Sequence, residues 1–217
     1  MQLVYWKAKG RAHPLRMLMA YLALSWTDVE LEPASWAAEK AETKMLFPNL
    51  PYIVDNNVRL SESTAIALHV AIKAGRSDLF PVGEAGVHHL QLIGVLNDLI
   101  PKLFDAARNE EGPLVQMVIA PSIRERINQL ETALAKKDWV VDKITYADFL
   151  LAYCVDMALH IPSLKNEKLL DKATGLVKHH DRVHKLKGVP EFLSKNPTAQ
   201  GKYLPAHAYV KVPLMTK

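Results

Sequence analysis

The hydrophobic pattern changes once along the chain, and this change constrains the fold more than any other feature. In the first 75 residues or so, short apolar runs that suit strands alternate with stretches of helical spacing. Runs at 3–6 and 26–31 predict strands, and the stretch at 51–60 predicts two strands joined by a tight turn at Asn56-Asn57. Helical stretches follow near Pro14, Trp36 and Ser61. After residue 83 no strand-like alternation of any length occurs, and apolar residues recur at helical spacing. The sequence therefore predicts a small α/β layer with a mixed sheet, followed by an all-helical part.

Local signals mark several element ends. The polar stretch from Arg76 to Gly83 predicts a linker between the two parts. Ser61 or Ser63 is expected to cap the third helix. Thr145-Tyr146-Ala147-Asp148 is a capping box, and the stretch at 149–159, apolar nearly all round, predicts a helix buried in the middle of a bundle.

The composition excludes several classes of protein. Of 217 residues, 49% are hydrophobic and 23% charged, which excludes a mainly disordered chain. The net charge is +4, and the basic residues are scattered except around Lys178 to Lys187, so we expect no nucleic-acid partner. A lone cysteine, Cys154, fits a reducing compartment. With no signal-length apolar run at the start and no apolar window long enough for a span, we expect a cytoplasmic protein without membrane contact.

Two histidines at 180 and 184 form the one pattern that resembles a metal motif. His180-Asp181-Arg182-Val183-His184 has the spacing of the H-E-x-x-H zinc motif, with aspartate in place of glutamate. A catalytic zinc ion needs a third ligand, and His207 is the only later histidine. We therefore expect a solvated helix face here and no metal.

Three further positions can be interpreted either as purely structural or as functional. Tyr5 ends the first predicted strand, where a tyrosine usually belongs to the core, although its hydroxyl could stabilise a thiolate. Glu62-Ser63 opens a helix whose backbone N–H groups suit an anion, although such a serine is more often only a cap. Leu50-Pro51 by itself predicts an ordinary loop proline, although a cis bond there would turn the Asn49-Leu50 backbone outward, free to pair with a ligand.

Taken in order, these positions resemble the cytosolic glutathione transferase family across nearly the whole chain. The region from Tyr5 to Trp36 resembles the sigma class, and that from Phe47 to Pro51 resembles the mu class. Glu62 stands where both classes usually have glutamine. The matching motifs are Tyr5-Trp6-x-x-x-Gly10-Arg11-Ala12, Trp36-x-x-x-Lys40, Phe47-Pro48-Asn49-Leu50-Pro51-Tyr52, Glu62-Ser63-x-Ala65-Ile66 and Ile144-Thr145-x-x-Asp148.

The resemblance implies a fold and a co-substrate. It implies an α+β thioredoxin-like domain at 1–77, with a mixed four-stranded sheet and three helices, and an all-helical domain at 84–217 that carries a hydrophobic substrate pocket. Glutathione would be the co-substrate and a hydrophobic electrophile the second substrate, in a detoxification reaction. The electrophile would lie between the turn at 8–13, the helix at 103–109 and the tail near Tyr203.

The resemblance also implies roles for single residues. Tyr5 would stabilise the glutathione thiolate, and Arg11 would add positive potential. The backbone of Leu50, presented by a cis-Pro51, would pair with the cysteinyl part of glutathione. The other implied glutathione contacts are Trp36 and Lys40 for the glycine carboxylate, Asn49, Glu62 for the ammonium, Ser63 for the γ-glutamyl carboxylate, and Asp98 for the ammonium bound in the partner subunit.

The assembly implied is a homodimer. Phe47 follows a polar stretch, and in the mu-like pattern this aromatic residue enters a pocket on the partner's helical domain. The alternative is that Phe47 packs within its own chain. Two other functions stay open: a glutathione-dependent isomerase or peroxidase acting on lipids, and a non-catalytic carrier or structural relative.

Overall fold

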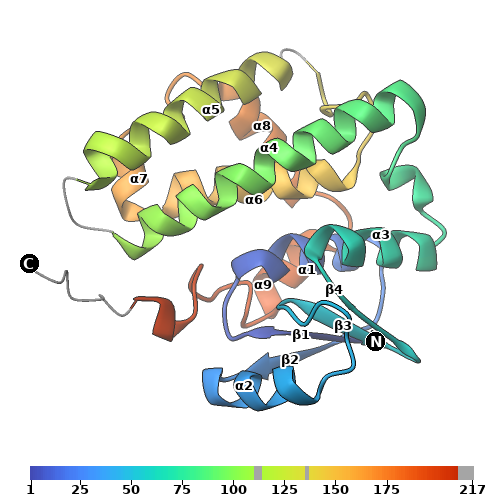
Figure 1. Ribbon diagram of the computed structural model, residues 1–217. Helices are drawn as coiled ribbons and strands as arrows, with labels where there is room; N and C mark the ends of the chain where they lie inside the picture. The colour runs from blue at the N-terminus through green and yellow to red at the C-terminus, as the bar shows by residue number, and fades with distance from the viewer. Residues whose placement is uncertain (110–113, 135–136, 210–217) are drawn as a thin grey trace, which may run out of the picture.

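Four strands form one mixed sheet at the N-terminal end of the chain (Figure 1). The computed structural model describes residues 1–109, 114–134 and 137–209. The strands are β1 (Gln2–Trp6), β2 (Thr27–Leu31), β3 (Tyr52–Asp55) and β4 (Val58–Ser61), in the order β2-β1-β3-β4. β2 runs parallel to β1, whereas β1–β3 and β3–β4 are antiparallel. The predicted mixed sheet, including the tight turn between its last two strands, is confirmed.

Three helices cover the sheet on two sides. They are α1 (His13–Tyr21), α2 (Pro33–Glu42) and α3 (Ser63–Lys73). Figure 1 shows α1 and α3 on the face turned toward the helical part, and α2 on the opposite face. α1 and α3 have buried faces, whereas α2 has no buried residue. Proline lies in the first turn of α1 and of α2, where its missing N–H leaves no helical hydrogen bond unmade.

The rest of the described chain is helical. After the 3₁₀ turn η2 (Ser77–Leu79) come α4 (Gly83–Arg108), a π-helical turn (Val115–Ile119), α5 (Ala120–Leu134), α6 (Tyr146–His160), α7 (Pro162–Asn166), α8 (Thr174–His184) and α9 (Val189–Lys195). α6 packs against α1, α4, α7 and α8, and every residue from 146 to 158 is buried. The predicted central helix is confirmed. None of the helices in the described ranges is both long and apolar enough to cross a membrane.

The capping box at the start of α6 is present and has more partners than the local sequence suggests. The Thr145 N–H and hydroxyl both donate to Asp148 Oδ2, at 2.7 and 3.0 Å. The other carboxylate oxygen lies 2.8 Å from His179 Nε2 of α8 and accepts from the Val140 N–H at 3.3 Å. Asp148 is fully buried, so these bonds also join α6 to α8 and to the preceding loop.

The predicted serine cap of α3 is wrong. The N-cap residue is Glu62, at φ +67°, and it makes no side-chain cap bond. The Ser61 hydroxyl donates instead to the Phe47 carbonyl, and Ser63 is already helical. The reason is tertiary: the hydroxyl of Ser61 holds the loop before β3 against the end of β4.

Candidate active site

A cavity of about 360 Å³ opens where the N-terminus of α3, the loop before β3 and the middle of α4 meet. This is within the range of small-molecule sites. Of the predicted site residues, six line it, together with two that the sequence analysis did not select. The lining is Arg11, Asn49, Leu50, Pro51, Glu62, Ser63, Thr64 and Asn97.

The first turn of α3 makes one wall of this cavity. Ser63 and Thr64 are its first two helical residues, and both line the cavity. Backbone N–H groups in a first helical turn lack intrahelical acceptors, and the helix dipole adds partial positive charge. This wall therefore suits a carboxylate.

Glu62 holds its position at the cost of backbone strain. A φ of +67° is rare for a residue with a side chain, and such conformations cluster at functional sites. Its carboxylate is exposed and accepts from Asn49 Nδ2 at 3.1 Å. A negative group thus stands beside the anion-binding wall, which matches a ligand that carries both an ammonium and a carboxylate.

The Leu50-Pro51 peptide bond is cis. This confirms the expectation from the resemblance, whereas the ordinary loop proline predicted from the dipeptide alone is wrong. The Leu50 N–H donates to the Asn49 side-chain oxygen at 2.9 Å. A ligand that pairs with the Leu50 backbone would replace this local bond.

Tyr5 lies at the end of β1, beside the turn that leads to α1. Its hydroxyl accepts from the Arg11 backbone N–H at 3.0 Å, and the side chain is buried. Burial raises the pKa of Tyr5, so the phenol stays protonated at neutral pH and keeps a hydrogen to donate. Gly10 makes this packing possible, because a Cβ there would lie 2.3 Å from the Tyr5 oxygen.

Arg11 connects this turn to the helical part. Its Nη1 donates to Asn97 Oδ1 on α4 at 3.4 Å. Sequence reasoning missed Asn97, although it precedes the selected Asp98 and is a polar residue within the apolar stripe of α4. It also missed Thr64, which follows the selected Ser63.

Tyr5 and the three remaining predicted contacts lie outside the cavity lining. The Trp36 ring on α2 stacks against Tyr52, with ring centroids 6.3 Å apart. Lys40, one turn further along α2, and Asp98 on α4 are exposed, and neither has a hydrogen bond or ion pair to the part of the chain that the structure describes. Their roles stay predictions.

A buried arginine that the sequence analysis passed over supports the turn before Gly10. Arg16 is 1% exposed and forms an ion pair with Asp28, with Nε 2.8 Å from Oδ1. Its Nη1 donates to the carbonyls of Ala8 and Lys9, at 2.9 and 3.4 Å. The sequence feature that could have identified Arg16 is its position among the apolar residues of a predicted helix.

The C-terminal tail lies against the same turn. The N–H groups of Lys9 and Gly10 donate to the carbonyls of Lys202 and Tyr203, both at 2.9 Å. Two of the three segments expected to border the electrophile pocket are therefore in contact. The pocket itself stays a prediction.

The solvated helix face predicted at 180–184 is wrong for the two histidines, although Asp181 and the neighbouring Lys178, Lys185 and Lys187 are exposed. His180 is 8% exposed, and its neighbour His179 is fully buried. Packing of α8 on α6 brings Asp156 to within 4.8 Å of the ring nitrogens of His180 and His184. Asp156 precedes the two histidines in the chain, whereas the sequence analysis considered only residues that follow them.

Comparison with known proteins agrees with this architecture. A model of the glutathione S-transferase N-terminal domain matches residues 1–72, and one of the C-terminal domain matches residues 97–196. The class-mu 26 kDa glutathione S-transferase of Schistosoma japonicum is 27% identical over 88% of this chain and 87% of its own. The hematopoietic prostaglandin D synthase of Gallus gallus is 28% identical over 90% of this chain and 96% of its own.

A solved structure shares the fold over nearly the full length. The glutathione S-transferase Blo t 8 superposes with a TM-score of 0.80 at 25% identity, covering 97% of this chain and 99% of that one. The thioredoxin-like domain and the all-helical domain are those expected. The chain therefore belongs to the glutathione S-transferase family of enzymes.

Proposed function

We propose that this chain conjugates glutathione to hydrophobic electrophiles, with Tyr5 stabilising the glutathione thiolate. The observation that supports this most is the turn at 5–11. There a protonated tyrosine hydroxyl accepts from the backbone N–H of Arg11, and Arg11 lines a cavity that suits a zwitterionic ligand. Both features come from segments that the family motifs predicted.

The chemistry needs a thiolate at neutral pH. A free cysteine thiol has a pKa near 8.5, so only a few per cent is ionised at pH 7. A hydrogen bond donated to the sulfur favours the charged form and lowers that pKa. Tyr5 would supply this hydrogen bond, and the Arg11 guanidinium, beside the cavity, would add positive potential.

The rest of glutathione would be held by groups around the cavity. The Ser63 end of α3 would receive the γ-glutamyl carboxylate, and Glu62 the ammonium. The Leu50 backbone would pair with the cysteinyl part, while Trp36 and Lys40 would reach the glycine carboxylate. With the tripeptide held, the thiolate attacks the electrophilic carbon, a C–S bond forms, and the leaving group departs with the bonding pair.

The test is conjugation of glutathione with a chlorodinitrobenzene, measured for the wild type and for Tyr5→Phe. Phenylalanine keeps the ring and removes the donor. A charge-assisted hydrogen bond contributes about 1.5–3 kcal/mol, so the rate at neutral pH should fall roughly 10- to 100-fold. Glutathione affinity should change little.

Tyr21→Phe is the matched control. It also removes one hydroxyl, which accepts from Arg76 Nη1 at 3.2 Å, outside the cavity. Its conjugation rate should equal that of the wild type. An unchanged rate in Tyr5→Phe would remove Tyr5 from the mechanism, and a wild type that conjugates no electrophile would refute the transferase function.

A second candidate is an isomerase or peroxidase that uses glutathione on lipid substrates. The similarity to a protein named hematopoietic prostaglandin D synthase favours it. Turnover of an oxygenated lipid without net consumption of glutathione would identify an isomerase. The non-catalytic carrier is weakened by the retained Tyr5 and cavity residues.

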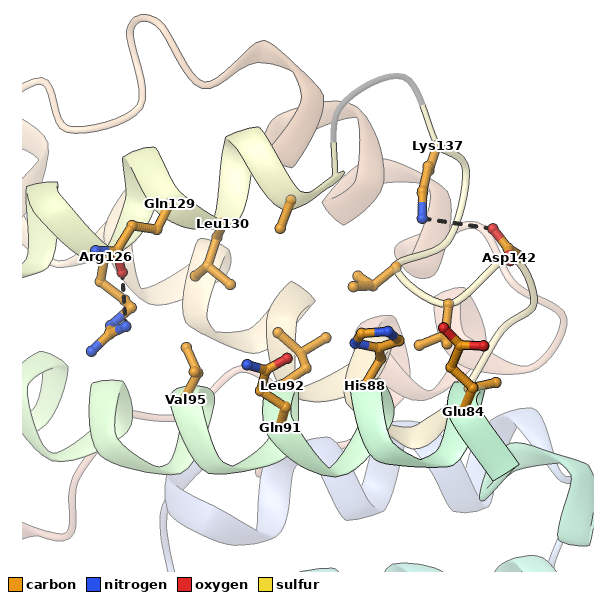
Figure 2. A pocket seen from close by; sticks show the side chains of 14 residues that line it. Glu84, His88, Gln91, Leu92, Val95, Arg126, Gln129, Leu130, Lys137 and Asp142 are labelled. Atoms are coloured by element: carbon orange, nitrogen blue, oxygen red, sulfur yellow. Dashed lines mark hydrogen bonds and ion pairs between the residues drawn. The ribbon is translucent and has the colours of Figure 1, made fainter. Parts of the chain in front are cut away.

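We further propose that the active unit is a cytoplasmic homodimer. Phe47 is 67% exposed, so the alternative in which it packs within its own chain is wrong. Val87 and Leu90 of α4 are also exposed. Between α4 and α5 lies a cavity of about 700 Å³, into which side chains of both helices point (Figure 2). This cavity is the proposed receptor for Phe47 of a second copy.

A further inference from the structure

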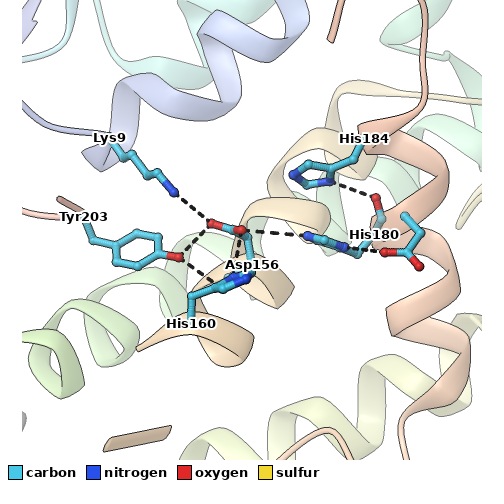
Figure 3. A network of polar contacts seen from close by, with 7 residues as sticks. Lys9, Asp156, His160, His180, His184 and Tyr203 are labelled. Atoms are coloured by element: carbon cyan, nitrogen blue, oxygen red, sulfur yellow. Dashed lines mark hydrogen bonds and ion pairs between the residues drawn. The ribbon is translucent and has the colours of Figure 1, made fainter. Parts of the chain in front are cut away.

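We propose that Asp156, His180 and His184 form a binding site for a divalent transition-metal ion, with Zn²⁺ as the ion that the site fits. These three residues, the triad below, lie outside the glutathione cavity. Figure 3 shows His180 and His184 on α8 facing Asp156 on α6. The proposal is independent of the transferase function.

The geometry brings three different ligand groups together. The two histidines are four residues apart, so they lie one turn apart on the same face of α8. One ligand atom from each residue of the triad lies within 4.8 Å of the other two. His180 Nε2 is 3.9 Å from Asp156 Oδ1. Around a tetrahedral zinc ion the ligand atoms are about 3.4 Å apart, so side-chain shifts of roughly 0.5–1.5 Å would complete the site.

The hydrogen bonds behind the rings prepare both imidazoles as ligands. His184 Nδ1 lies 2.9 Å from the His180 carbonyl, and His180 Nδ1 lies 3.0 Å from Asp181 Oδ1. Both partners are acceptors, so each Nδ1 carries the hydrogen, and in a neutral ring each Nε2 keeps its lone pair. A carboxylate or carbonyl behind the ring is the usual outer support of a metal-bound histidine.

One of these lone pairs lacks a partner. His180 Nε2 is buried and makes no hydrogen bond to any residue that the structure describes. A buried polar atom without a partner is costly, and a metal ion would satisfy it. The rings of His180 and His184 lie side by side, with centroids 3.9 Å apart and planes tilted by 34°. Neutral rings are the form that binds metal.

The charged groups around Asp156 leave one of its oxygens facing the histidines. Oδ2 accepts from the Tyr203 hydroxyl at 2.8 Å and from Lys9 Nζ at 3.4 Å. Oδ1 is 3.1 Å from Nδ1 of His160, whose side chain is 60% exposed and can turn away. Metal binding through Oδ1 therefore leaves the contacts with Lys9 and Tyr203 in place. Asp156 and Asp181 carry two negative charges against the one positive charge of Lys9, and His160 adds a further positive charge only when it is protonated.

The ligand set indicates the kind of metal. Two imidazole nitrogens and one carboxylate oxygen suit Zn²⁺, and Cu²⁺ at higher affinity, whereas Mg²⁺ and Ca²⁺ prefer oxygen ligands. Because the triad spans α6 and α8, a bound ion would hold these helices together and raise the melting temperature.

The test is calorimetric titration of chelator-treated full-length protein with ZnCl₂. The wild type should bind one Zn²⁺ per chain, and His184→Gln should weaken that affinity by about 10- to 100-fold or more. His207→Gln is the matched control, because His207 is an exposed histidine of the C-terminal tail, outside the triad. Melting curves with and without Zn²⁺ should show that the ion raises the melting temperature of the wild type and of His207→Gln, but not that of His184→Gln.

His184 is only half-buried, and its substitution leaves Asp156 with Lys9 and Tyr203, so this variant is the primary one. Asp156→Asn serves as a second variant once circular dichroism shows that it is folded. Equal Zn²⁺ affinity in the wild type and His184→Gln would overturn the proposal and indicate adventitious surface binding. Failure of the wild type to bind Zn²⁺ would overturn it as well, whatever the conjugation assay shows.

Discussion

Tyr5 and Gly10 show how closely single residues are matched in this site. Gly10 has φ +41°, and a Cβ there would lie within 2.3–2.7 Å of the Tyr5 oxygen and two ring carbons. Contacts this short force the ring to move. The glycine is therefore required by the tyrosine beside it as well as by the turn.

Gly10→Ala should abolish most of the conjugation activity, because the Tyr5 hydroxyl can no longer keep its place. Gly75→Ala is the control, since Gly75 also has positive φ, +69°, but has no atom within 4 Å of its added Cβ. Both variants should lose roughly 1–2 kcal/mol of unfolding free energy from the left-handed backbone. Conjugation rates test the predicted loss of activity, and urea unfolding tests the loss of stability expected for both variants. A fully active Gly10→Ala enzyme would contradict the prediction.

At the scale of elements, Asp55 joins the end of β3 to α3. It is 6% exposed and accepts from Lys73 Nζ at 2.8 Å, with His69 Nε2 at 3.0 Å. Hydrogen bonds from Lys73 and His69 lower the pKa of Asp55 below its ordinary value of 3.8. Because the folded pKa lies below the unfolded one, the carboxylate stabilises the fold above about pH 4 and loses this effect as pH falls through the folded pKa.

Asp55→Asn should therefore lower the unfolding free energy at pH 7 by about 1.5–3 kcal/mol. The difference from wild type should shrink as pH falls from 4 towards 3, which urea unfolding at several pH values would measure. Asp78→Asn is the control, because hydrogen bonds from Arg76 also lower the pKa of Asp78, but its side chain is 58% exposed. Asp78→Asn should lower the unfolding free energy by less than about 1 kcal/mol. If the difference in unfolding free energy between Asp55→Asn and the wild type does not change with pH, the ionised Asp55 carboxylate is not its cause.

At the scale of the whole molecule, the exposed apolar groups are consistent with the proposed homodimer. Leu46 and Phe47 project from the loop before β3, and the α4–α5 cavity lies in the other domain (Figure 2). Loop and cavity belong to different domains of the chain, so a two-fold axis could seat the loop of each copy against the cavity of the other.

Phe47→Ser should weaken dimerisation about 30-fold, the effect of losing an aromatic interface anchor worth about 2 kcal/mol. Glutathione binding should weaken as well, because Asp98 would no longer reach the neighbouring site. Sedimentation over a concentration series tests the first effect and calorimetry the second. Ile72→Ser, on α3 and 59% exposed, is the control and should associate like the wild type. If Phe47→Ser dimerises as tightly as the wild type, insertion of Phe47 into the α4–α5 cavity of a second copy is rejected.

The sequence by itself determined the features that depend on neighbours in the chain. The change from mixed to helical periodicity, the Thr145–Asp148 box and the ordered motifs around Tyr5 and Glu62 are local patterns, and periodicity and capping need only a few adjacent residues. The fold and family could therefore be predicted. Six residues of the cavity were also predicted, because they belong to those motifs.

Only the tertiary structure decided which distant side chains meet. Asn97 reaches the cavity because α4 passes the turn at Arg11, and Arg16 is buried because Asp28 and the Ala8 carbonyl surround it. Ser61 bonds to the Phe47 carbonyl rather than capping α3. His180 was expected to be exposed to solvent but is buried, because α8 packs on α6 and places Asp156 beside it. Such contacts are set by the packing of whole elements, which local spacing does not encode.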